Sequence, residues 1–143
     1  MLKSNFTNRW RLWQLAGMNW KKFLPLLPAL LLTGCATNFT RLTPNEQPRN
    51  ANNLYPVEVA FNSQQQALRW DSIQPYVLVN GQPYPLRQVP MVTNRWEGLV
   101  SVPPTADSVS YRFKFDYLYN NWGTPPKPNS AYSPQYKLEI LNQ

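Results

Sequence analysis

Apolar and polar residues alternate most clearly between Val109 and Tyr119, and this alternation predicts a β-strand. One set of alternate positions is aromatic throughout: Tyr111, Phe113, Phe115, Tyr117 and Tyr119. The positions between them carry Arg112, Lys114 and Asp116, with Leu118 as the exception. A period of two places alternate side chains on opposite faces of a sheet. We therefore expect a long strand, central in its sheet, with an aromatic inner face.

Six further segments show strand signals, separated by turn residues. The segment from Tyr76 to Val79 runs into Asn80-Gly81, which predicts a tight hairpin because both turn positions need a positive φ. The return strand contains Pro83 and Pro85, which cannot donate to a ladder, so it should lie at a sheet edge. The other predicted strands are 57–61, 68–70, 96–102 and 136–141, and the proline-rich stretch 120–134 is predicted to be a loop. Seven short strands indicate an all-β fold, a β-sandwich.

An apolar run from Phe23 to Leu32 precedes the only cysteine of the chain. The run follows Lys21-Lys22 and is shorter than the roughly 20 residues of a spanning helix. Leu32, Thr33, Gly34 and Cys35 resemble a bacterial lipobox. This resemblance implies that Cys35 becomes residue one of the mature protein and carries a diacylglycerol and an N-acyl lipid. Because Ala36 stands where aspartate would signal inner-membrane retention, the resemblance implies the outer membrane, with the domain facing periplasm or cell surface.

These signals divide the chain into three parts. Residues 1–34 are a signal peptide, in which translation starts either at Met1 with a long basic region or, as we favour, at Met18. Residues 35–53 are the lipidated cysteine and a polar, flexible tether that cannot bury enough surface to order itself. Residues 54–143 are the sandwich domain.

The net charge expected for the mature protein is much smaller than that of the whole chain. The whole chain has 14 basic and 7 acidic residues, a net charge of +7. Five of the basic residues and none of the acidic ones precede Cys35, so the mature part has a net charge of +2. We therefore expect no nucleic-acid partner.

The stretch from Asp107 to Phe113 resembles the sixth strand of immunoglobulin-like domains. In those domains an aspartate lies four positions before a corner tyrosine, and a core residue follows two positions later. The resemblance implies that Tyr111 is the corner tyrosine and that Phe113 stands where antibody domains have cysteine. It covers seven residues, and without a disulfide the chain is similar to fibronectin-type or early-set relatives.

Catalytic chemistry has little support in the sequence. The chain contains no histidine, which excludes catalytic triads and histidine-based acid–base catalysis. The carboxylates are scattered singly rather than paired as in glycosidases. Without histidine or a spare cysteine we expect no zinc site, no cofactor beyond the covalent lipid, and no enzyme activity.

Aromatic residues are the stronger functional signal. We expect Trp70 and Trp96 to lie in the core and Tyr119 to pack at the sheet edge, because such residues are highly buried on average. Trp122 lies in the predicted loop, and loops often carry function. It either folds back over the end of the sandwich, which we favour, or stays exposed and binds together with Tyr132.

The sequence thus predicts a membrane-anchored, non-catalytic binding or scaffold module that docks on another envelope protein. The alternative hypothesis is glycan or peptidoglycan binding through exposed aromatics such as Trp122, since aromatic faces stack on sugar rings.

Overall fold

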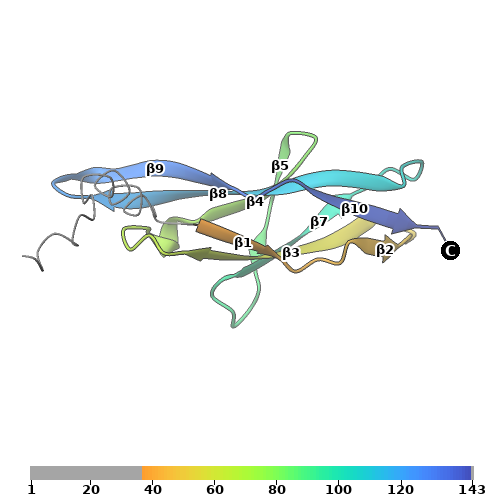
Figure 1. The fold of residues 1–143 in the computed structure, drawn as a ribbon, viewed down its shortest axis with the longest axis horizontal. Helices are drawn as coiled ribbons and strands as arrows, with labels where there is room; N and C mark the ends of the chain where they lie inside the picture. Colours follow the sequence, from red (N-terminus) through yellow and green to blue (C-terminus); the bar gives the residue numbers. More distant parts are fainter. Residues whose placement is uncertain (1–36, 143) are drawn as a thin grey trace, which may run out of the picture. The chain divides into compact units, whose positions relative to one another are not determined.

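The aromatic strand predicted from the sequence is β8 in a computed structural model that describes residues 37–142, and it lies inside the larger of two sheets (Figure 1). Sheet A has the order β1 (Thr37–Arg41), β3 (Leu54–Ser63), β7 (Arg95–Ser101), β6 (Arg87–Gln88). Sheet B has the order β2 (Glu46–Pro48), β10 (Tyr136–Leu141), β8 (Ser108–Asn121), β4 (Gln74–Val79), β5 (Gln82–Pro85), and β9 (Thr124–Tyr132) also pairs with β8. Leu32, Thr33, Gly34 and Cys35, which resemble a lipobox, lie outside the described residues.

The prediction of an all-β sandwich is confirmed, with about ten strands rather than seven. Immunoglobulin domains pair strands A-B-E-D in one sheet and C-F-G in the other. Listed in their order within each sheet, β1, β3, β7 and β6 correspond to the first set, and β4, β8 and β10 correspond to the second. Strand β9 is an addition to this frame, inserted between the sixth and seventh strands.

Alternation builds the core between β3 and β8. The Phe61 ring stacks on Phe115 with centroids 4.7 Å apart, and Trp96 of β7 meets Phe115 edge-on at 5.0 Å. All three side chains are buried, which confirms the prediction for Trp96. Aromatic contacts of this kind contribute about 1 kcal/mol each beyond the area they bury.

The expected tether is wrong between residues 37 and 48, where β1 and β2 form. Strand β1 pairs antiparallel with β3, and β2 pairs parallel with β10. A single aromatic residue explains the ordering, because the Phe39 ring packs 5.0 Å from Phe61 and 5.3 Å from Phe115. Just beyond β1, buried Thr43 accepts a hydrogen bond from the Glu58 amide and donates one to the Glu58 carbonyl.

The predicted hairpin at Asn80-Gly81 is confirmed, with φ of 50° and 81° at these two residues. The return strand is split, because β5 pairs with β4 in sheet B and β6 pairs with β7 in sheet A. Leu86 lies at this crossing and is buried. A Cβ on Gly98 would lie 2.6 Å from Leu86 Cδ2, so glycine leaves the space that the leucine fills.

Three other expectations are corrected. The strand expected at 68–70 is only one bridge, from Leu68 to Tyr119, after which the chain turns into η3 (Trp70–Ser72) and leaves Trp70 47% exposed. The turn forms because Ser72 Oγ donates to the Arg69 carbonyl and accepts from the Leu118 amide. The loop expected at 120–134 is instead the end of β8 and the strand β9.

Tyr111 is buried two residues before Phe113, as the resemblance implies, but the corner hydrogen bond does not form within residues 37–142. Its side chain points into the core and lies near Thr43 and Arg41. Burial raises the pKa of this phenol.

Packing at the crossing gives the first prediction. Gly98→Val should destabilise the domain by about 1–3 kcal/mol, because the new side chain displaces Leu86. Combining it with Leu86→Ala should cost less than the sum of the two single changes, since the smaller residue frees the same space. Urea unfolding of all four proteins measures this, and additivity within about 0.5 kcal/mol would contradict it.

Candidate functional site

A hairpin arm extends from the sandwich at the end of β8 (Figure 1). We define the arm as residues 119–128. Its turn is Trp122-Gly123, flanked by the pair Asn121 and Thr124, and Gly123 adopts the positive φ of 68° that the turn requires. Trp122 is fully exposed, at 101%. The expectation that it folds back over the sandwich is therefore wrong.

Prolines shape the arm without preventing its pairing. The ladder steps from the pair of Tyr119 with Lys127 to the pair of Asn121 with Thr124, which is two residues on β8 and three on β9. The extra residue of this bulge falls at Pro125-Pro126, where a ladder bond from proline is impossible. Because β9 is an edge strand there, it tolerates residues without an N–H.

Side chains clamp the base of the arm. Asp116 accepts hydrogen bonds from Lys114 Nζ and Ser130 Oγ, and the Asn129 amide donates to the Tyr117 hydroxyl. Partial burial opposes ionisation of Asp116, but the two hydrogen bonds outweigh it and hold the pKa of the carboxyl below its usual value. The clamp therefore fixes the direction in which the arm points.

The three aromatics predicted to bind do not converge. Tyr132 lies at the base of the arm opposite Lys114, half-exposed, with the Arg112 guanidinium 4.9 Å from its ring centroid. Trp122 lies eight residues beyond Lys114, the residue opposite Tyr132 on β8, which is about 26 Å in an extended strand. Tyr119 is partly buried between them. A small ligand cannot stack on Trp122 and Tyr132 together.

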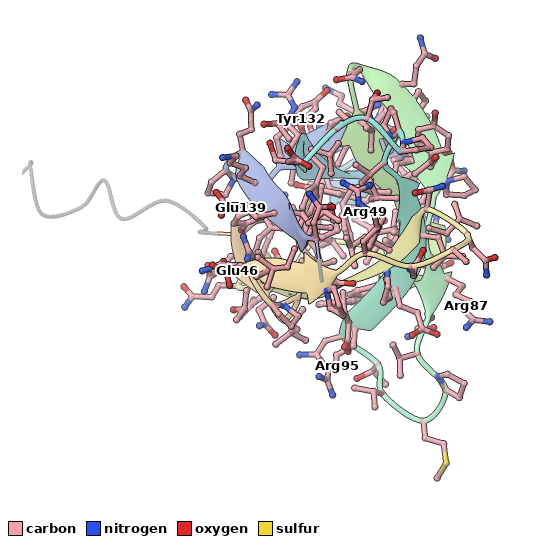
Figure 2. The ribbon with its side chains drawn as sticks, turned by 90° about the vertical axis from the view of Figure 1, so that its right-hand side faces the viewer. Glu46, Arg49, Arg87, Arg95, Tyr132 and Glu139 are labelled. Carbon is pink, nitrogen blue, oxygen red and sulfur yellow. The ribbon has the colours of Figure 1, made fainter. Side chains whose placement is uncertain are left out.

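A second surface, which sequence reasoning missed, is an apolar cleft of about 620 Å³ beside sheet A. We call it the Leu99 cleft, and its lining residues are Pro56, Tyr84, Pro85, Leu86, Arg87, Glu97, Gly98 and Leu99. Tyr84 and Leu99 are 46% and 55% exposed. Arg87 pairs with Glu97 at 2.9 Å and points outward at the side of the sandwich (Figure 2). The sequence of β7 contains one signal for this cleft. Leu99 shares its set of alternate positions with the polar residues Glu97 and Ser101, so an apolar side chain is expected on the outer face of the strand.

A third surface forms where Trp70 leaves the core. A cleft of about 590 Å³ is lined by both Trp70 and Trp96, with Asp71, Asn94 and Gln88 among its polar lining residues. The Trp70 ring meets Phe61 edge-on at 6.1 Å, which steadies it while one side stays exposed.

Six of the seven acidic side chains are each paired with one cation rather than gathered. The ion pairs are Asp107–Arg49, Asp71–Arg69, Glu97–Arg87, Glu58–Arg95, Asp116–Lys114 and Glu139–Lys137. Within residues 37–142, groups of three or more potential metal ligands are absent. In the same part of the chain, helices with the length and hydropathy needed to cross a membrane are absent as well.

Comparison with known proteins adds no family: neither a protein-family model nor a curated protein matches the chain.

The clamp gives a prediction about pH. Because the pKa of Asp116 is lowered on folding, its contribution to stability is present above its unfolded value of 3.8 and is lost as pH falls through the folded value. Asp116→Asn should therefore be less stable than the parent at neutral pH and lose less stability on acidification. Urea unfolding between neutral and acidic pH tests this. Parallel curves for parent and variant would contradict it.

Proposed function

We propose that the chain is a lipid-anchored, non-catalytic binding module of the cell envelope that docks on another envelope protein. The anchor is proposed from the Leu32-Thr33-Gly34-Cys35 stretch. The non-catalytic role is supported by a chain without histidine, whose one cysteine the anchor would use.

The Leu99 cleft is the observation that carries the docking role. Its lining is mainly aliphatic and aromatic, and its charged members are the ion pair of Arg87, which is largely exposed, with Glu97. An apolar centre with a polar rim is the usual anatomy of a protein–protein interface. Leu54, 42% exposed on the same face of β3, extends the apolar surface beyond Pro56. Such a surface favours a protein that inserts an apolar side chain.

The position of the cleft also suits an anchored protein. Leu99 pairs with Pro56 near the start of β3, whereas Thr37, the first described residue, pairs with Ser63 at the other end of that strand. The cleft is thus remote from the end of the domain to which the anchor would attach, and a partner could reach it.

Glycan binding is the second candidate, and the Trp70 cleft favours it. A steadied, half-exposed indole beside Asp71 and Asn94 combines a stacking face with hydrogen-bonding groups. This combination moves the glycan hypothesis from Trp122, which lacks such neighbours at the tip of the arm, to Trp70.

Crosslinking tests the docking surface. A photoreactive residue in place of Leu99 should give one discrete protein adduct in intact cells. The same residue in place of Leu141, which is 46% exposed on β10, should give none. Leu99→Asp should abolish co-purification of the captured protein while stability changes by no more than about 0.5 kcal/mol, because the site is exposed. The docking role fails if position 99 gives no protein adduct.

Retention on immobilised peptidoglycan tests the second candidate. Trp70→Ala should weaken retention about fivefold, the equivalent of one aromatic contact of about 1 kcal/mol. Trp122→Ala, which removes an exposed indole outside the cleft, should leave retention unchanged. If the parent protein is not retained, glycan binding is ruled out for this ligand.

A further inference from the structure

The arm and Thr37, the first described residue, lie at the same end of the domain. Phe39 of β1 contacts Phe115 of β8, while Arg41 Nη1 donates to the carbonyl of Lys137, which pairs with Ser110. The first residue of β1 therefore lies on the side of Phe39 toward which β8 continues into the arm. Figure 1 shows the β8–β9 hairpin extending past the first residue of β1.

Chain length places Cys35 within reach of that end. Cys35 precedes Thr37 by two residues, which span at most about 7 Å. Cys35 precedes Phe39 by four residues, so at 3.3–3.6 Å per residue it can lie at most about 14 Å from Phe39 in the direction of the arm. Trp122 lies about 23 Å in the same direction, seven residues beyond Phe115 in extended strand. The tip of the arm thus reaches beyond the anchoring residue by at least about 9 Å.

The composition of the arm suits a lipid interface. Between Asp116 and Glu139 the sequence contains no acidic residue, and Lys127 is the one charged residue of the arm. Pro125, Pro126 and Pro128 lack N–H groups, so this edge strand presents fewer donors that would lose their water on contact with lipid. Tryptophan itself concentrates at membrane interfaces, where its ring is buried and its N–H stays hydrated.

We propose that the arm places Trp122 in the interfacial layer of the same leaflet that holds the lipids of Cys35. The inference rests on the anchor of the proposed function. Two attachment points then hold the domain in one orientation, with the arm end against the membrane and the Leu99 cleft turned away from it. The polar part of a bilayer leaflet is about 5–8 Å thick, so the reach of the arm beyond Cys35 is long enough to bring Trp122 into this layer.

A protein partner at the tip is disfavoured by area. A standard interface buries about 800 Å² on each partner, and a two-residue turn on a two-stranded arm offers only a small part of that. Insertion into an interface needs only one indole and a neutral or basic surround.

Fluorescence quenching by brominated lipid tests the contact. The full-length, lipidated protein is reconstituted in vesicles of phosphatidylethanolamine and phosphatidylglycerol, with and without brominated phosphatidylcholine. After Cys35 the chain has three tryptophans, of which Trp96 is buried. We expect the bromolipid to quench the parent. Trp122→Phe should lose most of the quenching, and Trp70→Phe, the matched control, should keep it.

Opposite results would overturn the inference. If Trp122 is not quenched by bromolipid but is quenched by acrylamide in water, the arm does not touch the membrane, and the lipid anchor is unaffected by that result. A photoreactive residue at position 122 should give lipid adducts in cells, and a protein adduct would assign the arm to a protein partner instead. Labelling with radioactive palmitate checks the premise: a mature protein without label overturns the anchor and the inference together.

Discussion

The buried ring of Phe115 contacts aromatic residues from three different strands of the opposite sheet. The ring stacks on Phe61 of β3, meets Trp96 of β7 edge-on and contacts Phe39 of β1. These three contacts join sheet A to β8 of sheet B. From the contact of Phe39 with Phe115, the first residue of β1 and the arm lie in the same direction. The same packing therefore sets the direction of β1 and the direction of the arm.

The surface features follow from places where the sandwich departs from regular pairing. The chain crosses between sheets at Leu86, and the crossing opens the cleft beside Leu99. The turn at η3 leaves Trp70 partly exposed, with its ring edge-on to Phe61, and opens the second cleft. Continuation of β8 past Leu118 produces the arm. Each of these three surface features therefore arises where strand pairing is locally irregular.

The sequence predicted the features that depend on local pattern. Alternation in β8 and the Asn80-Gly81 turn report directly on neighbouring residues, so both could be recognised without the structure. The packing of Phe39 could not be predicted in this way, because an isolated aromatic residue in a polar stretch is covered by residues far away in the chain. The prolines after Trp122 were interpreted as a loop, since the bulge that accommodates them is visible only in the register with β8. The clefts combine residues from separate strands, and only alternation at Leu99 hinted at one of them.

The attachment of β1 has a mechanical consequence. Strand β1 begins two residues after Cys35 and pairs with β3 through five residues, from Thr37 to Arg41. A pull on the proposed lipid anchor would act along the axis of β1 and tend to slide it past β3. Sliding loads the hydrogen bonds of the ladder together, whereas a perpendicular pull would break them in turn. Because Phe39 packs against the core, such a load would be resisted in shear, and the rate of unfolding under force would set how long the domain holds.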